Sequence, residues 1–268
     1  MSAAEPAIAR LIAQRNGRVL TLTISNPALR NAMTPDLYAA AGAAFRDASS
    51  DDGIGAIVLA GEGKHFCGGG NLNRLLAQRE LPRESQARHL DALHDWVSAM
   101  RACPKPIIAA VEGAAAGGGF SICLGCDLIV AAEDAKFVMS YVKAGLSPDG
   151  GGSYALAHAL PPQAALEMLL DGAPVTAARL HALGIVNRVV ASGMALDEAM
   201  TWARRLAEGP AAAHARIKRL VHAARGRPHR AQLDAERDAF VESLYGDECA
   251  EGIAAFLEKR APRFVKSD

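Results

Sequence analysis

Three uninterrupted glycine triplets, at residues 68–70, 117–119 and 150–152, constrain this chain more than any other feature. The first two follow the apolar runs 54–60 and 106–111, which are typical of buried strands. Glycine lacks Cβ, so a turn built from it can adopt unusual backbone angles and expose its N–H groups. Such N–H groups bind anions, including the oxyanion that forms when a carbonyl is enolised. The pattern predicts sites at the ends of strands.

Known glycine motifs do not explain these triplets. Neither of the first two continues as G-x-x-x-x-G-K-[ST] or G-x-G-x-x-G, which excludes a P-loop and a dinucleotide-binding fingerprint. Ser121 is a poor match to a nucleophile elbow, because Cys123 stands where that motif has glycine. For any single triplet, a tight turn with close helix–strand packing remains an alternative. Two triplets after two strands favour a pair of N–H donors that converge on one oxygen.

Composition excludes several classes of protein. The 268 residues are 50% hydrophobic, which is enough for a sizeable core, and 29 basic residues balance 29 acidic ones. Zero net charge argues against nucleic acid or an acidic membrane as a partner. The chain has no apolar run long enough to span a bilayer, and residues 1–11 contain no apolar run of the length that a signal peptide needs. Its five cysteines are an odd number. We expect reduced thiols, a cytoplasmic protein and no metal site.

The pattern changes along the chain, and it predicts an α/β fold. We predict strands near 18–24, 54–60, 106–111, 127–131 and 186–190, and helices near 34–50, 75–101, 120–126, 162–170 and 176–183. Leu81-Pro82 predicts a break in the second helix, and Thr176 is a predicted N-cap. Nearly everything after 196 is predicted to be helical. We therefore divide the chain into a core, 1–195, and a C-terminal helical region, 196–268.

Several ordered motifs resemble the enoyl-CoA hydratase/isomerase (crotonase) superfamily over essentially the full length. They are residues 26–33, 63–72, 105–119, 126–131, 145–152 and 256–264. The resemblance implies a spiral of ββα units that binds an acyl-CoA thioester, followed by C-terminal helices for oligomerisation. It also implies a homotrimer or a dimer of trimers. Coenzyme A enters as part of the substrate, and no covalently bound cofactor is implied.

The same resemblance assigns residues to a site. Gly70 and Gly118 would be the two N–H donors that polarise the thioester carbonyl. CoA would lie along two loops and the last helix, at Arg30, Ala32, Lys64, Gly68, Asn71, Leu72, Phe256 and Lys259. Gly68 and Leu72 would lie by the adenine, and Phe256 and Lys259 often come from a neighbouring subunit. Lys64 and Lys259 have an alternative interpretation as solvated surface lysines, and Asn71 stands where the family commonly has Asp.

The residues that would carry out the reaction depart from the hydratase pattern. Ser121 and Tyr141 occupy the positions of the two hydratase glutamates, and neither side chain can act as a carboxylate base. Asp149 instead matches the acid/base of enoyl-CoA isomerases and of ring-modifying isomerases in phenylacetyl-CoA breakdown. It would remove a proton from C2 and return it at C4, while Tyr141 lines the pocket or donates a hydrogen bond. Ser121 and His65 are lesser candidates.

Other interpretations stay open on the sequence alone. Asp149 could be an ordinary turn residue before glycines. A hydratase or ring hydrolase of the same family could recruit water through Asp149 or Tyr141, and a silent acyl-CoA-binding homologue would need no base. The acyl group is not predicted, because the residues expected to line its pocket fall in the segment 75–94.

Overall fold

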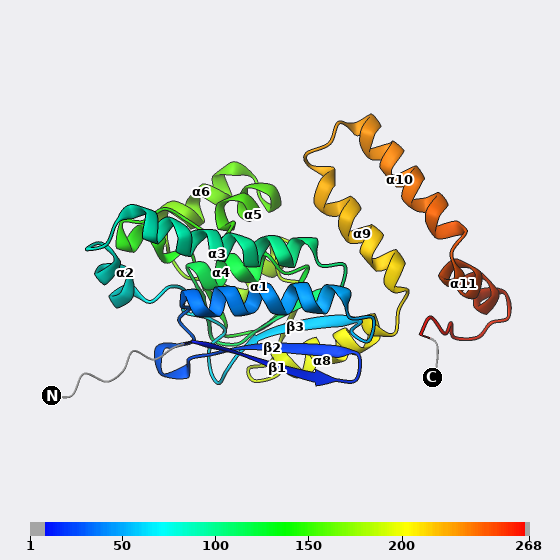
Figure 1. Cartoon of the computed structure of the whole chain (residues 1–268), viewed down its shortest axis with the longest axis horizontal. Helices are drawn as coiled ribbons and strands as arrows, with labels where there is room; N and C mark the ends of the chain where they lie inside the picture. Colours follow the sequence, from blue (N-terminus) through cyan, green and yellow to red (C-terminus); the bar gives the residue numbers. More distant parts are fainter. Residues whose placement is uncertain (1–8, 266–268) are drawn as a thin grey trace.

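A computed structural model describes residues 9–265, and most of its strands form one six-stranded sheet (Figure 1). The strand order is β1-β2-β3-β4-β6-β9, in which β1 is antiparallel to β2 and all other neighbours are parallel. The strands are β1 (Arg10–Asn16), β2 (Val19–Ser25), β3 (Ala56–Gly61), β4 (Ile107–Val111), β6 (Leu128–Ala132) and β9 (Arg188–Val190). The strand predictions at 18–24, 54–60, 106–111, 127–131 and 186–190 are confirmed within two residues at each end.

A second sheet has three very short strands in the order β5-β7-β8. They are β5 (Ala114–Ala116), β7 (Lys136–Val138) and β8 (Val175–Thr176), and β7 is parallel to β5 and antiparallel to β8. Strand β5 follows β4 after a turn at Gly113, so the two sheets join directly before the second glycine triplet. The triplet therefore begins directly after β5, a few residues beyond the carboxyl end of β4.

Eleven α-helices and two 3₁₀ helices complete the described part of the chain. The first group is α1 (Pro35–Ser50), α2 (Leu72–Gln78), α3 (Arg83–Ala102), α4 (Gly118–Leu124), α5 (Gly152–Ala159) and α6 (Pro162–Asp171). The second is α7 (Ala177–Ala182), α8 (Ala195–Ala207), α9 (Ala211–Ala224), α10 (His229–Leu244) and α11 (Asp247–Leu257), with η1 (Pro27–Leu29) and η2 (Ser140–Ala144) as 3₁₀ turns. The predicted break at 81–82 separates α2 from α3. The predicted cap is also confirmed, since the Thr176 hydroxyl accepts a hydrogen bond from the Arg179 N–H.

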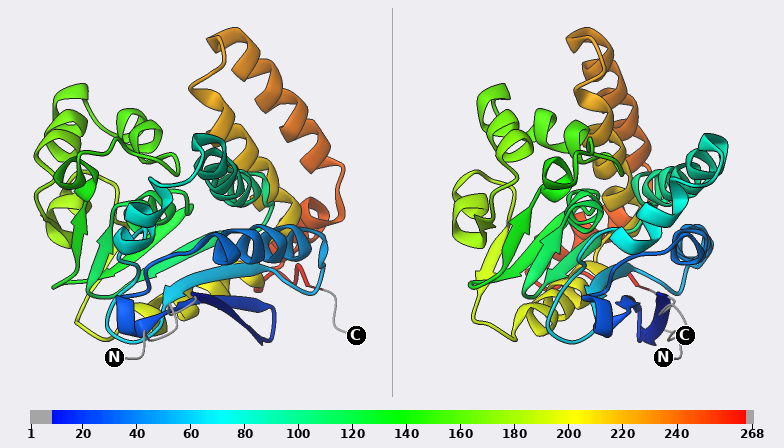
Figure 2. Two further views of the ribbon diagram at one scale, coloured as in Figure 1. Left: turned by 60° about the vertical axis from the view of Figure 1, so that its left-hand side comes forward. Right: turned by 90° about the vertical axis from the view of Figure 1, so that its left-hand side faces the viewer.

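Both faces of the large sheet are buried, which explains the unbroken apolar runs of β3 and β4. On one face, alternate residues such as Ile57, Leu59 and Ala109 pack in the same cluster as residues of α1 and α3. On the other face, Val58 and Ile108 pack against α8. Figure 2 shows α1 and α8 on opposite sides of the sheet. The sheet is therefore a rigid platform for the loops at its edge.

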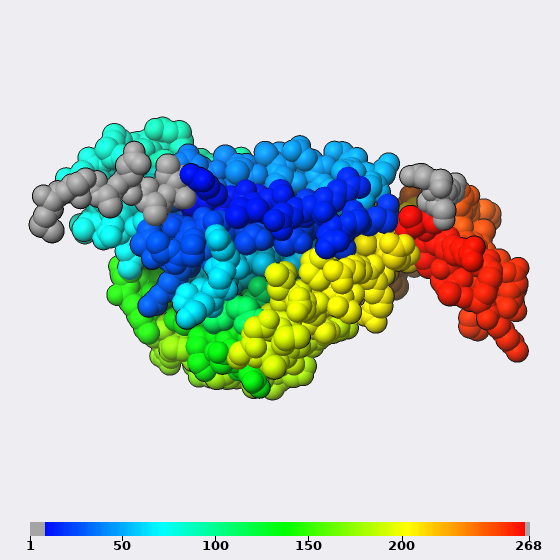
Figure 3. All heavy atoms as spheres, turned by 90° about the horizontal axis from the view of Figure 1, so that it is seen from below, coloured from blue at the N-terminus to red at the C-terminus, as the bar shows by residue number. Residues whose placement is uncertain are grey.

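The last three helices differ from the rest of the chain. Helix α9 contains no buried residue, and α10 and α11 each bury one, Ala239 and Ala255 respectively. In Figure 3 the C-terminal residues project from one end of the molecule. Helix α8 by contrast buries five residues against the sheet. The change in packing thus falls after Ala207, whereas the predicted division at 195/196 falls where α8 begins.

Candidate active site

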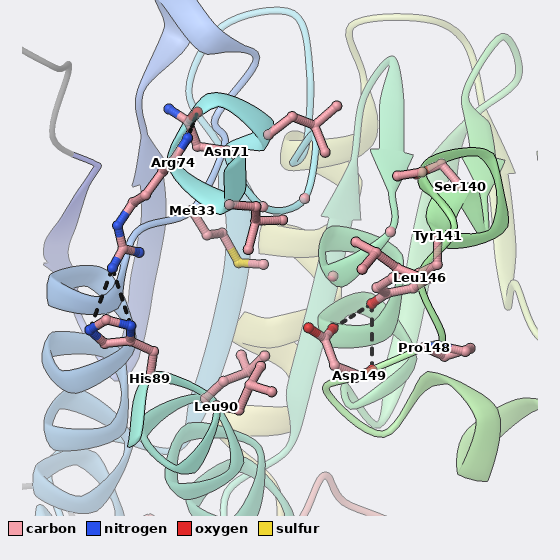
Figure 4. A pocket seen from close by; sticks show the side chains of 18 of the residues that line it. Met33, Asn71, Arg74, His89, Leu90, Ser140, Tyr141, Leu146, Pro148 and Asp149 are labelled. Carbon is pink, nitrogen blue, oxygen red and sulfur yellow. Dashed lines mark hydrogen bonds between the residues drawn. The ribbon is translucent and has the colours of Figure 1, made fainter. Parts of the chain in front are cut away.

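The first two glycine triplets meet at a cavity of about 330 Å³. Its walls come from the loop after β3, the start of α4, the turn η2 with the residues after it, and the helices α1, α2 and α3. Figure 4 shows the cavity with Tyr141 and Asp149 on one wall and Arg74 and His89 on the other. Segments distant in the sequence thus form one site.

Two backbone N–H groups of the glycine triplets are available in this cavity. Gly118 is the first residue of α4, and both it and Gly70 line the cavity. Within the described residues, neither N–H donates a hydrogen bond to another protein group. The triplets lie in contact, because a Cβ added at Gly69 would come within 3.3 Å of the Gly118 nitrogen. Unpaired N–H groups at adjacent turns are suited to bind a carbonyl oxygen that gains negative charge.

Neighbouring hydrogen bonds fix the turns that carry these donors. The Met33 N–H donates to the Gly69 oxygen at 2.7 Å, and the Gly117 N–H donates to the Val138 oxygen at 2.8 Å. Gly69 and Gly117 have φ of 91° and 50°, which glycine adopts without strain. The donors are therefore held in place before a ligand arrives.

A chain of hydrogen bonds runs from the cavity wall into the interior through Asp149, Tyr141 and Ser121. The Tyr141 hydroxyl donates to Asp149 Oδ1 at 2.6 Å and lies 2.9 Å from Ser121 Oγ. Because Tyr141 has one hydroxyl proton and gives it to Asp149, Ser121 is the donor to Tyr141. Ser121 is buried behind Tyr141 and does not line this cavity. Ser121 thus orients the Tyr141 hydroxyl, and Tyr141 in turn orients the Asp149 carboxylate.

The environment keeps Tyr141 protonated. Burial raises the pKa of its hydroxyl well above the ordinary value of 10.0, and the charge of Asp149 and the hydrogen bond to it raise it further. The phenol is thus a donor at neutral pH and cannot act as a base. Among the described residues that line the cavity, Asp149 is the only carboxylic acid. It is the one group there able to take up a proton as a carboxylate.

Predicted CoA-binding residues gather in a neighbouring groove of about 430 Å³, which Arg30 and Lys64 line. Gly68 connects this groove to the cavity, since its N–H donates to the Arg30 oxygen at 2.7 Å. Ala32 is buried and lines neither the groove nor the cavity. The structure therefore brings Arg30, Lys64 and Gly68 together, and Ala32 lies beneath the surface.

Asn31 links the two loops that form the groove. The sequence alone did not indicate it as a site residue. Its side chain is fully buried, accepts a hydrogen bond from the Asn26 N–H at 2.9 Å, and donates to the oxygens of Glu62 and His65 at 2.9 and 2.6 Å. These bonds tie the loop before α1 to the loop after β3. Its position within the matching motif 26–33 was the available signal.

The remaining predicted residues fall in different places. Asn71 lines the cavity and caps α2, because its Oδ1 accepts a hydrogen bond from the Arg74 N–H at 3.2 Å. Leu72 also lines the cavity and is 63% exposed. Phe256 is 83% exposed on α11, which lies at the other end of the molecule from α2 (Figure 1).

Two further candidates lie away from Asp149. Lys259 follows α11 and, like Phe256, lines neither the cavity nor the groove of its own chain. His65 faces the groove, and its Nδ1 accepts a hydrogen bond from the Ala114 N–H at 3.2 Å. It anchors the start of β5 and does not line the cavity of Asp149.

A polar part of the cavity was not anticipated. Tyr38 of α1, Arg74 of α2, and Gln86 and His89 of α3 all line it. Arg74 Nη2 lies 3.4 and 3.5 Å from the two ring nitrogens of His89. The sequence spacing of these four polar residues does not indicate that they lie together, because they come from three separate helices.

The chain belongs to the enoyl-CoA hydratase/isomerase family, whose model matches residues 14–267. It is 33% identical over 248 residues to 1,2-epoxyphenylacetyl-CoA isomerase of Escherichia coli (strain K12), covering 92% of this chain and 95% of the relative. It is 32% identical over 257 residues to 2,3-dehydroadipyl-CoA hydratase of the same organism, covering 96% of this chain and 99% of that protein. The resemblance inferred from the motifs is confirmed. The names of these two relatives differ in the reaction, isomerisation for the first and hydration for the second.

Solved structures agree with this assignment. The crystal structure of an enoyl-CoA hydratase from Polaromonas sp. JS666 matches with a TM-score of 0.93 and 49% identity, covering 94% of this chain and 98% of that one. The predicted crotonase-like α/β fold is thereby confirmed. No helix in the described residues is long and apolar enough to cross a membrane.

Proposed function

We propose that the protein isomerises CoA thioesters of unsaturated or ring-derived acids, with Asp149 as the acid/base. One observation carries this proposal: Asp149 is the only carboxylic acid among the described residues that line a cavity with two free N–H donors. A single carboxylate beside an oxyanion site suits a proton transfer within one substrate. A relative from Escherichia coli is named as an isomerase, which supports this type of reaction.

Each group has a distinct part in the proposed reaction. The N–H groups of Gly70 and Gly118 bind the thioester oxygen and stabilise the enolate, for which one such donor is worth about 3–4 kcal/mol. Asp149 Oδ1 accepts the bond from Tyr141, and Oδ2 has no partner among the described residues. Oδ2 then removes a proton from C2 of the substrate and delivers it to C4. The electron pair of the C2–H bond becomes, through the enolate, the new C2–C3 double bond, and the pair of the former C3–C4 double bond forms the new C4–H bond.

The test is to incubate the protein with a 3-enoyl-CoA and follow formation of the 2-enoyl isomer. Asp149→Asn removes the proton acceptor while keeping an oxygen that can accept the bond from Tyr141. We expect its rate to fall by about 10²–10⁴-fold, the usual contribution of general acid–base catalysis. Asp149→Glu keeps a carboxyl group and should retain more activity than Asp149→Asn. Unchanged turnover in Asp149→Asn would remove Asp149 from the reaction.

Hydration is the second candidate reaction. It is favoured by the name of another relative, 2,3-dehydroadipyl-CoA hydratase. The positions of the hydratase glutamates here hold Ser121 and Tyr141, joined by a hydrogen bond of 2.9 Å. Neither residue is a carboxylate, which argues against activation of water by a glutamate pair. Uptake of oxygen from ¹⁸O-labelled water distinguishes hydration or ring hydrolysis from isomerisation. Tight binding without turnover across a panel of thioesters would instead indicate a silent acyl-CoA-binding protein.

We also propose that the protein assembles as a trimer or a dimer of trimers, with Phe256 and Lys259 reaching the CoA held by a neighbouring subunit. Neither residue lines the groove of Arg30 and Lys64 in its own chain, and α11 lies at the other end of the molecule from α2 (Figure 1). Phe256 is an exposed aromatic side chain on a helix that buries only Ala255. Sedimentation of the purified protein would measure the assembly directly.

A further inference from the structure

The two walls of the active-site cavity carry opposite charges. Asp149 lies on one wall, and Arg74 of α2 lies on the other (Figure 4). Apolar side chains, among them Met33, Leu90 and Leu93, line the same cavity. A bound acyl group therefore meets Asp149 on one side of an apolar space and a cation on the other.

The guanidinium of Arg74 has little to bind within the protein. No carboxylate of the described residues lies within 4 Å of it. Its side-chain contact is the one between Nη2 and the ring of His89. Arginine has five N–H donors and stays charged at any working pH, so most of these donors are available to a ligand. The charge of Arg74 is not neutralised by an ion pair of its own chain.

The residues around Arg74 supply further hydrogen-bond donors. Burial, Arg74 and Arg88 lower the pKa of His89 by more than the nearby carboxylate of Asp36 raises it, so the ring stays neutral at pH 7. Burial and the charge of Asp149 raise the pKa of Tyr38 well above 10.0, so its hydroxyl stays protonated. Neither the Tyr38 hydroxyl nor the Gln86 amide has a hydrogen-bond partner among the described residues. Together with Arg74 they form a donor-rich wall.

A purely aliphatic acyl group would fit the apolar side chains but would leave this wall unsatisfied. An aliphatic group bound in the cavity would displace water from the unpaired guanidinium and would not replace the hydrogen bonds that are lost. A carboxylate at the far end of the acyl group would restore them, since carboxylates accept two parallel bonds from arginine. The tyrosine and glutamine donors could bond to the same carboxylate.

We infer that the preferred substrate is an acyl-CoA thioester whose far end carries a carboxylate, and that Arg74 recognises this carboxylate. The inference rests on the proposed function in one respect, the placing of the thioester carbonyl at Gly70 and Gly118. The helix that carries Arg74 begins at a cap, since Asn71 Oδ1 accepts a hydrogen bond from the Arg74 N–H.

The test measures binding, so it does not depend on turnover. The probes are two saturated, unreactive thioesters of equal chain length: hexanoyl-CoA and the mono-CoA thioester of the six-carbon dicarboxylic acid. We expect the wild-type protein to bind the second at least about tenfold more tightly, or about 1.4 kcal/mol. Arg74→Gln should remove this preference, and Arg74→Lys should restore part of it.

The matched control is Arg79→Gln, which removes an exposed arginine that follows the same helix and does not line the cavity. It should leave both affinities unchanged. Equal wild-type affinities for the two probes would overturn the inference. So would an Arg74→Gln variant that weakens both probes equally, because Arg74 would then contact the phosphates of CoA. A failure to isomerise 3-enoyl-CoA would contradict the proposed reaction and leave these binding results intact.

Discussion

The helices that cover the sheet and the helices that follow Ala207 are held by different forces. Helix α8 buries five residues against β3, β4 and β6, whereas the next helix, α9, buries none. Helix α9 is instead tied to the core by polar contacts around Asp127. Lys218 Nζ lies 2.6 Å and His222 Nε2 lies 3.2 Å from the oxygens of this carboxylate.

This difference separates the chemistry from the assembly. All residues that line the cavity precede α8, in the region where α1 and α3 pack on the sheet. The last three helices expose large apolar side chains such as Phe240 and Phe256. They add little to the fold of their own chain. Three substitutions test this separation, in order from the largest expected effect on the chain itself to the smallest.

The largest effect is expected in the packed region, at Gly119. A Cβ at this residue would lie 2.3 Å from the backbone oxygen of Cys67, and neither chain segment can move easily. We expect Gly119→Ala to lose about 3 kcal/mol of stability or more, which urea unfolding would measure.

The control for this prediction is Gly118→Ala. Its nearest neighbour would be the terminal methyl of Met33, at 2.8 Å, and this flexible end can shift. The control should unfold closer to the wild type while losing activity. Equal unfolding midpoints for Gly119→Ala and the wild type would contradict the packing argument.

An intermediate effect is expected at Asp127, where the two regions meet. The carboxylate also accepts a hydrogen bond from the Ile107 N–H at 2.8 Å. Asp127→Ala leaves this N–H without a partner and removes the carboxylate beside the largely buried Lys218, whose Nζ keeps only its bond to the Lys105 oxygen. We therefore expect a loss of about 2 kcal/mol. Protease cleavage near residues 208–210 should also become faster, which gel electrophoresis would show.

Asp47→Ala is a suitable comparison, because it removes an exposed carboxylate on α1 that has no ion pair within the described residues. It should change stability by no more than about 0.5 kcal/mol. Cleavage of Asp127→Ala at the wild-type rate would mean that α9 is held by something other than this carboxylate.

The smallest effect on the chain itself is expected at Phe240 of α10, which is 68% exposed. Phe240→Ser should leave the circular dichroism spectrum unchanged, because the side chain buries little surface in its own chain. We expect it to lower the mass measured by sedimentation towards that of one chain, 28.0 kDa. Glu236→Ser on the same helix is the control and should sediment as the wild type does. A wild-type protein that already sediments as one chain would contradict the proposed assembly.

The sequence predicted the elements that are long and buried, and it missed those that are short or exposed. Strands β3 and β4 were visible because every residue on β4 and nearly every one on β3 is buried. Strand β1 was missed because most of its side chains are exposed and show no alternation. Strands β5 and β7 have three residues each, too few for a periodic pattern.

The same limit applies to the site. Gly70, Gly118, Tyr141 and Asp149 were predicted from motifs, and all four line one cavity. Arg74 could not be predicted, because its proximity to His89 depends on how α2 and α3 pack. Resemblance indicates residues that a family uses in common, whereas the selectivity of one member depends on contacts between helices.

The buried thiol of Cys67 has a consequence for the lifetime of the protein. The proposed product is a conjugated thioester, an electrophile to which thiolates add. Cys67 directly precedes the first glycine triplet, yet its Sγ is fully buried, donates to the Asn31 oxygen at 3.2 Å, and does not line the cavity. Burial raises the pKa of this thiol to about 12, so it stays protonated and unreactive. The turn proposed to bind the thioester oxygen is thus protected from alkylation by the proposed product.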